Sequence, residues 1–146
     1  MLDAATVDEF CRAAGQADIA VGVVERGSLM RRLPNTKRTW LKFRGGAYTG
    51  ANLFALSSPR VAPAIELWRS VEQDRKKGWR LLSLLGPVVL AGSVLRLISL
   101  DAVLARVGRG LGLKIAAVQL ANPLAGVDVD KPADHALAEA ILAGRA

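Results

Sequence analysis

The feature that most constrains the fold of this chain is an apolar run at residues 19–24, Ile-Ala-Val-Gly-Val-Val. Apolar side chains occupy both faces of this run, which is typical of a strand that is covered on both sides in a parallel sheet. We therefore expect a buried strand over Asp18–Val24.

Helical patterns lie on either side of this strand. Apolar spacing predicts a helix over Asp3–Ala14, with Thr6 and Glu9 as a capping box and Gly15 as its stop. After the strand, Ser28 is expected to cap a short helix over Leu29–Leu33. The order helix, strand, helix indicates an α/β fold built of layers.

A hairpin is predicted next, from two strands joined by a glycine-bearing turn. The strands are Thr39–Phe43 and Tyr48–Leu56, and the turn is Arg44–Ala47. Small and polar residues at 49–52 interrupt the second strand, where they would let a ligand approach the backbone. The Asn52 amide could then read donors and acceptors. A glycine bulge with Asn52 in a turn is the alternative interpretation.

The second half of the chain predicts more helices. Ser58-Pro59 opens one that leads to a basic run at residues 75–78. The nearly apolar segment 81–100 could just span a bilayer, but a Gly-Pro break and an arginine inside it favour two short helices, either buried or lying on a membrane surface. Ser99 is expected to cap Leu100–Val107. A loop at 108–112 and a strand over Lys114–Leu120 follow.

The net charge of +7 is unevenly distributed. Residues 26–80 hold thirteen Lys and Arg against three acids, and the rest of the chain holds seven against ten. Such a positive middle would attract phosphate-bearing ligands or an anionic membrane, although a merely solvated basic face is the alternative. We do not expect nucleic acid as a partner, because the few aromatic residues offer no stacking platform.

A single cysteine, Cys11, excludes an internal disulfide and a cysteine metal cluster. The opening residues are polar and acidic, without the basic and apolar regions of a signal peptide. We therefore expect a cytoplasmic protein.

The strongest chemical signal is the stretch Gly-Val-Asp-Val-Asp-Lys-Pro-Ala-Asp at residues 126–134. On a short strand Asp128 and Asp130 would project on one side while Val127 and Val129 face the core. Such a pair suits a divalent cation. The alternative is that one or both aspartates cap the helix predicted over residues 133–143, which Pro132 opens.

This stretch, the apolar strand before it and the segment Tyr48–Leu56 together resemble nucleotidyltransferases of the molybdenum-cofactor guanylyltransferase-like (MobA-like) class. The resemblance implies an α/β fold with a Rossmann-like, glycosyltransferase-A-type sheet in three layers. It covers most of the chain, but one short motif and the order of the elements carry it.

The resemblance also implies an activity and a site. Members join a nucleoside triphosphate to a phosphate or sugar-phosphate acceptor, release pyrophosphate and hold Mg²⁺ between acidic positions. Mg²⁺ prefers few carboxylates together with substrate phosphate oxygens, which agrees with such a site. The residues so implied are Asp128 and Asp130 for the metal and Arg38, Lys42, Asn52 and Lys131 for the acceptor.

One part of the family pattern is missing. No glycine-rich triphosphate loop precedes Asp3, and the first metal aspartate is absent. We therefore expect one domain, residues 1–146, that resembles the C-terminal, acceptor-binding half of an N-terminally incomplete nucleotidyltransferase. Such a domain would either need a separate N-terminal half to bind a nucleotide or be inactive. An exposed sheet edge would favour a homodimer. A non-catalytic basic module for phosphate or a membrane surface is the alternative function.

Overall fold

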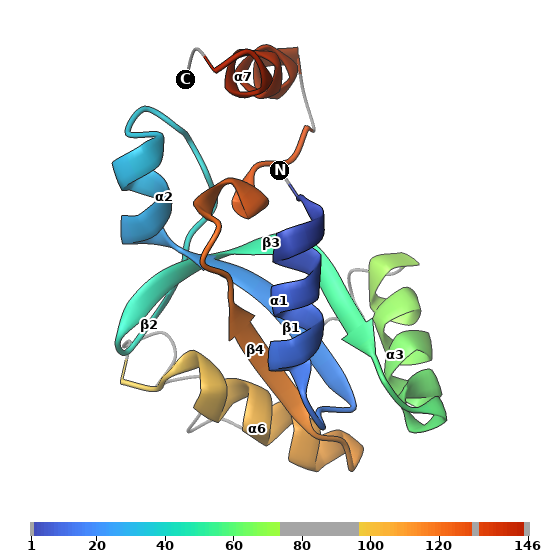
Figure 1. The fold of residues 1–146 in the computed structure, drawn as a ribbon. Helices are drawn as coiled ribbons and strands as arrows, with labels where there is room; N and C mark the ends of the chain where they lie inside the picture. The colour runs from blue at the N-terminus through green and yellow to red at the C-terminus, as the bar shows by residue number, and fades with distance from the viewer. Residues whose placement is uncertain (1, 74–96, 130–131, 145–146) are drawn as a thin grey trace.

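A mixed four-stranded sheet lies at the centre of the computed structural model, which describes residues 2–73, 97–129 and 132–144 (Figure 1). The strand order is β2-β3-β1-β4, and the strands are β1 (Ile19–Glu25), β2 (Leu41–Phe43), β3 (Gly46–Leu56) and β4 (Ile115–Gln119). Strand β1 pairs parallel with β4 but antiparallel with β3. The predicted α/β class is confirmed, whereas the Rossmann-like type stays a prediction.

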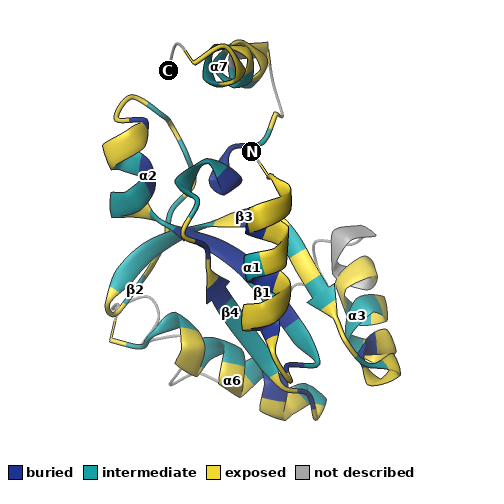
Figure 2. Ribbon diagram, in the orientation of Figure 1, coloured by how far each residue is buried: buried dark blue, intermediate teal, exposed yellow. Residues whose placement is uncertain are grey.

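Strand β1 is the core strand, as its apolar run predicted, and it carries buried residues along its middle (Figure 2). Ala20 and Val24 on one of its faces are fully buried. They belong to one apolar cluster with Phe10 of helix α1 (Ala4–Ala14) and Leu29 of helix α2 (Arg26–Arg32). Helix α1 crosses in front of β1 and β4 in Figure 1, so this face of the sheet is the one that it covers. Burial of these side chains supplies most of the driving force for folding.

Carboxylates cap the first two helices, which differs from the sequence prediction. The side chain of Asp3 accepts from the backbone N–H of Thr6, and that of Glu25 accepts from the N–H of Ser28. The capping box at Thr6 and Glu9 and the cap at Ser28 were therefore wrong. The reason is that each carboxylate lies three residues before a free helical N–H and also complements the helix dipole.

Helix α6 (Leu100–Leu111) begins as predicted, because Ser99 accepts from the N–H of Ala102. It does not stop at 107: the helix continues to Leu111, and Gly112 ends it in the left-handed conformation at φ 67°. The loop predicted at 108–112 was wrong. Gly108 stays inside the helix, where a Cβ would lie 2.4 Å from the carbonyl oxygen of Leu113.

The segment after β3 forms a short 3₁₀ turn, η1 (Pro59–Val61), and helix α3 (Ala62–Gln73). The predictions for the basic run at 75–78 and for most of the apolar segment 81–100 lie outside the described residues. Among the described residues, no helix is both long enough and apolar enough to cross a membrane.

The chain reaches Asp128 through a turn and not along a strand. After β4 comes the 3₁₀ turn η3 (Pro123–Gly126), in which the Asn122 side chain accepts from the N–H of Leu124. Residues 127–129 belong to no strand, and Val129 is exposed while Val127 is buried. The strand predicted here and the inward orientation of Val129 were therefore wrong. Helix α7 (Pro132–Leu142) follows.

Candidate functional site

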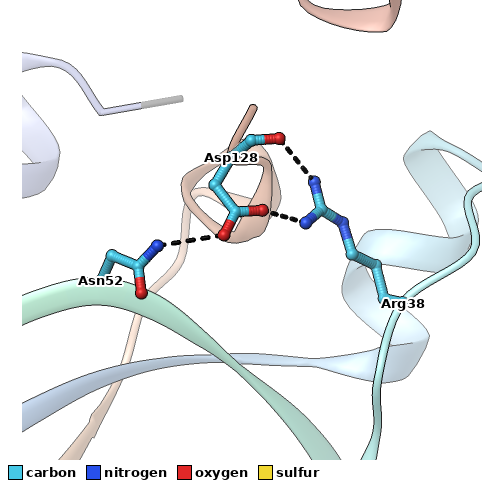
Figure 3. Close-up of polar contacts among 3 residues, drawn as sticks. All are labelled: Arg38, Asn52 and Asp128. Carbon is cyan, nitrogen blue, oxygen red and sulfur yellow. Dashed lines mark hydrogen bonds and ion pairs between the residues drawn. The ribbon is translucent and has the colours of Figure 1, made fainter. Parts of the chain in front are cut away.

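Three segments that are far apart in the sequence meet at the carboxylate of Asp128 (Figure 3). The Nη1 of Arg38 donates to Oδ1 of Asp128, and Nη2 donates to its backbone oxygen over 3.2 Å. The Nδ2 of Asn52 donates to Oδ2 over 3.0 Å. Both carboxylate oxygens thus have a partner from a different segment, and we name these three residues the Asp128 cluster.

The apolar core fixes the position of Asp128. Val127, the residue before it, is buried, and Gly126 lies against β1 and β3. A Cβ at Gly126 would lie 3.1 Å from Cγ2 of Thr49 and 3.3 Å from Cβ of Val24. A side chain at this position would therefore force its neighbours to shift, and glycine lets the backbone come this close without that shift. This positioning role of Gly126 was not predicted from the sequence, and the glycine two residues before the aspartate was the available signal.

A bulge in β3 presents Asn52. The register of β3 against β1 shifts between Val21 and Val23, opposite the segment that contains Asn52. Asn52 has φ 51°, and asparagine is among the few residues that tolerate this left-handed conformation. The bulge, one of two interpretations of the small residues at 49–52, is present, but Asn52 lies within β3 and not in a turn, and it is Asn52 rather than Gly50 that has the positive φ. The bulge turns the Asn52 amide out of the regular pleat, where it contacts Asp128.

Arg38 lies in the connection between α2 and β2, and its side chain is only 11% exposed. A guanidinium has five N–H donors in a planar fork. Two of them bind Asp128, and no other described residue accepts from the rest. Within the described part of the chain, the remaining donors thus have no protein acceptor and could bind an anionic group.

The charge of the cluster is balanced. Partial burial raises the pKa of Asp128, but hydrogen bonding to Arg38, the charge of Arg38 and the Asn52 amide outweigh it, so that the pKa is lowered overall. The carboxylate consequently stays ionised at neutral pH and holds the guanidinium in one orientation.

The described residues do not form a metal site by themselves. Both oxygens of Asp128 already accept hydrogen bonds, and the adjacent guanidinium repels a second cation. Among the described residues there is no group of three or more His, Cys, Asp or Glu side chains that could hold an ion. Asp130, the other predicted ligand, lies outside the described residues. The predicted Mg²⁺ site therefore has no complete ligand set here.

The structure brings together three of the six predicted site residues: Arg38, Asn52 and Asp128. Lys42 lies on β2, where its backbone pairs with Ala47 and its side chain is exposed. No described contact joins it to the Asp128 cluster. Lys131, like Asp130, lies outside the described residues.

No protein-family model and no curated protein matches this chain.

One solved structure does match it, a hypothetical transferase from Thermus thermophilus. The two structures superpose with a TM-score of 0.76 at 35% sequence identity, over 89% of this chain and 56% of the Thermus chain. This chain thus spans little more than half the length of that protein. Over most of its length, the chain shares its fold with a hypothetical transferase.

Proposed function

We propose that this chain is a transferase-like domain that binds a phosphorylated ligand at the Asp128 cluster. The observation that carries the proposal is the oriented Arg38 guanidinium, which is largely buried, is held by Asp128 and has further N–H donors without an acceptor among the described residues. Arginine in this state suits bidentate binding of phosphate. The fold shared with a hypothetical transferase supports a group-transfer role.

Within this proposal each residue has a distinct task. Arg38 binds the phosphate oxygens, Asp128 orients Arg38, and Asn52 holds the second oxygen of Asp128. The finer proposal, from the resemblance to MobA-like nucleotidyltransferases, is that the ligand is a nucleotide or the phosphorylated acceptor of a nucleotide. Oriented donors of this kind lower the cost of binding, because they are not reorganised when the ligand arrives.

Mg²⁺ enters the proposal with the ligand. The ion usually keeps several waters and takes one or two carboxylates together with substrate phosphates. Because both oxygens of Asp128 already accept hydrogen bonds, the protein ligand in this proposal is the carboxylate of Asp130. We expect the affinity for a nucleoside triphosphate to be higher in Mg²⁺ than in a chelator.

Isothermal titration tests the proposal, with nucleoside triphosphates and sugar phosphates as probes, in Mg²⁺ and in EDTA. Replacing Arg38→Gln should weaken binding by about tenfold or more, because one charge-assisted contact is lost. Arg106→Gln is the matched control, because this substitution removes the same charge from an exposed position on α6. Equal weakening by both substitutions, or no binding to the wild type, would contradict a site at Arg38.

The second candidate is a basic module that binds an anionic membrane surface. Exposed basic residues on α2, on the connection after it and on the β2–β3 hairpin favour it: Arg26, Arg31, Arg32, Lys37, Lys42 and Arg44. Co-sedimentation with phosphatidylserine vesicles that fades with added salt supports this candidate. If this candidate is right, the double substitution Arg31→Gln and Arg32→Gln should weaken binding to the vesicles more than Arg38→Gln does. This difference distinguishes the two functions.

A further inference from the structure

Among the described strands, none pairs with the outer edge of β3 beyond the hairpin. Strand β2 pairs with Gly46–Tyr48 only, whereas β1 pairs with the other edge of β3 as far as Leu56. No described strand pairs with the outer edge of residues 49–56. A strand edge of this kind presents unpaired N–H and C=O groups.

The backbone direction at this edge follows from one hydrogen bond. The N–H of Ser57 donates to the carbonyl of Asp18, next to β1, over 3.0 Å. Backbone groups alternate between the two sides of a strand, so those of Ala55 point to β1 while those of Phe54 and Leu56 point outward. Phe54 and Leu56 thus each offer one N–H and one C=O to an additional strand.

The side chains of the same two residues are apolar and exposed. Phe54 is 57% exposed and Leu56 53% exposed, on the face opposite to Ala55 and the core around α1. Helix α3, which follows β3 in the chain, leaves them uncovered and also leaves Trp68 exposed. Folded proteins usually protect such an edge with Lys, Pro or a covering helix.

Charge favours a second copy as the partner. Residues 45–59 contain no charged side chain, in a chain with a net charge of +7. Two copies repel each other where their basic surfaces meet, and this uncharged strip is a surface where they approach without that repulsion. The strip also matches itself, since an antiparallel pair about Ala55 places Phe54 opposite the partner's Leu56.

We propose that the edge of β3 at Phe54 and Leu56 is a self-association surface, where β3 of a second copy pairs antiparallel to it. The outward N–H and C=O groups of these two residues form the hydrogen bonds. The apolar side chains of Phe54 and Leu56 pack against their counterparts across the pair. The two sheets then form one continuous sheet around a twofold axis.

Sedimentation velocity over a wide range of protein concentration tests this pairing. The wild type should form a dimer, and Phe54→Lys should weaken dimerisation by about tenfold or more, because it places a charge in the apolar pair. Phe54 is exposed, so this variant should keep its fold, which circular dichroism checks. Val129→Lys is the control, since Val129 is also apolar and is exposed to a similar degree but lies outside β3.

Amide hydrogen exchange followed by NMR gives a second readout without any substitution. The amides of Phe54 and Leu56 should become protected as the protein concentration rises, while that of Ala55 is protected throughout. A wild type that stays monomeric, as expected if a strand from another polypeptide takes this edge, would overturn the proposal. Dimers that leave both amides unprotected, or that Val129→Lys weakens as much as Phe54→Lys does, would overturn it as well.

Discussion

Two neighbouring regions of the molecule are held together in opposite ways. The apolar centre around Phe10, Val24 and Leu29 excludes water and depends on shape. The Asp128 cluster is polar, partly exposed and depends on three directed hydrogen bonds. Gly126 joins the two regions, because it lies against Val24 while Asp128 follows two residues later. The comparison teaches that a rigid apolar centre sets the position of a polar group that can still meet solvent.

The largest effect is expected in the apolar centre. Phe10→Ala should lower the free energy of unfolding by about 3–5 kcal/mol, because it removes a buried ring and leaves a cavity. Urea denaturation followed by circular dichroism measures it. Val7→Ala on the same helix is the control and should cost under about 1 kcal/mol, since Val7 is exposed. A small loss at Phe10 would contradict the dominance of this cluster.

A substitution at the junction should affect both regions. Gly126→Ala brings a Cβ to within 3.1 Å of Thr49 and 3.3 Å of Val24, so these neighbours must move. We expect a loss of about 1–3 kcal/mol, as for other overpacked sites. Ligand affinity should fall too, because Asp128 shifts with the turn. Gly50→Ala is a useful control, since nothing lies within 4 Å of a Cβ there. If Gly126→Ala left both stability and affinity unchanged, the two regions would not be coupled.

Removing the carboxylate alone should cost less. Asp128→Ala leaves the guanidinium of Arg38 without its partner, and we expect a loss of about 1–2 kcal/mol, because the pair is partly exposed to solvent. A double-mutant cycle with Arg38→Ala isolates the interaction between the two side chains. A coupling energy near zero would mean that Asp128 does not orient Arg38.

The pH dependence of the free energy of unfolding at acidic pH reports on the same carboxylate. The pKa of Asp128 is lowered in the folded protein, so its contribution is fully present above the unfolded value of about 4 and is lost as the pH falls through the folded pKa. Asp128→Asn should therefore reduce the loss of stability below about pH 4. Asp3 and Glu25 also have lowered pKa values, so part of the loss should remain. An unchanged slope would contradict the pairing.

The smallest effect is expected at the bulge. Asn52→Gly loses one hydrogen bond to Asp128 but relieves the positive φ, so the two effects should nearly cancel, within about 0.5 kcal/mol. Asn52→Ala loses the bond without that relief and should be the less stable variant by about 1 kcal/mol. Thermal denaturation of both variants measures the difference, and an equally stable alanine variant would argue against the bulge conformation.

The apolar centre was largely predictable from the sequence and the cluster was not. The apolar run at 19–24 predicted β1, because burial on both faces leaves a pattern that is local in sequence. Helix starts were less predictable: Ser28 and Glu25 can both cap, and only the folded chain shows that the carboxylate does so. The strand predicted around Asp128 was wrong, because the alternating Val and Asp pattern gives no sign of the 3₁₀ turn that precedes it.

The cluster depends on contacts across 76 and 90 residues, which no local pattern encodes. Arg38, Asn52 and Asp128 were named as site residues from a family resemblance, but in separate roles. That Asp128 binds Arg38 and Asn52 directly follows only from the tertiary structure. A sequence pattern thus predicts the residues of a site more readily than it predicts the contacts between them.

NMR of the Arg38 side chain tests the central claim most directly, that the oriented guanidinium in the Asp128 cluster binds a phosphorylated ligand. During titration with a nucleoside triphosphate and Mg²⁺, the Nε–Hε signal of Arg38 and the Nδ2 signals of Asn52 should shift and saturate together, while the Nε–Hε signal of Arg106 stays in place. Shifts spread over the exposed arginines of α2, with Arg38 and Asn52 unchanged, would contradict the account.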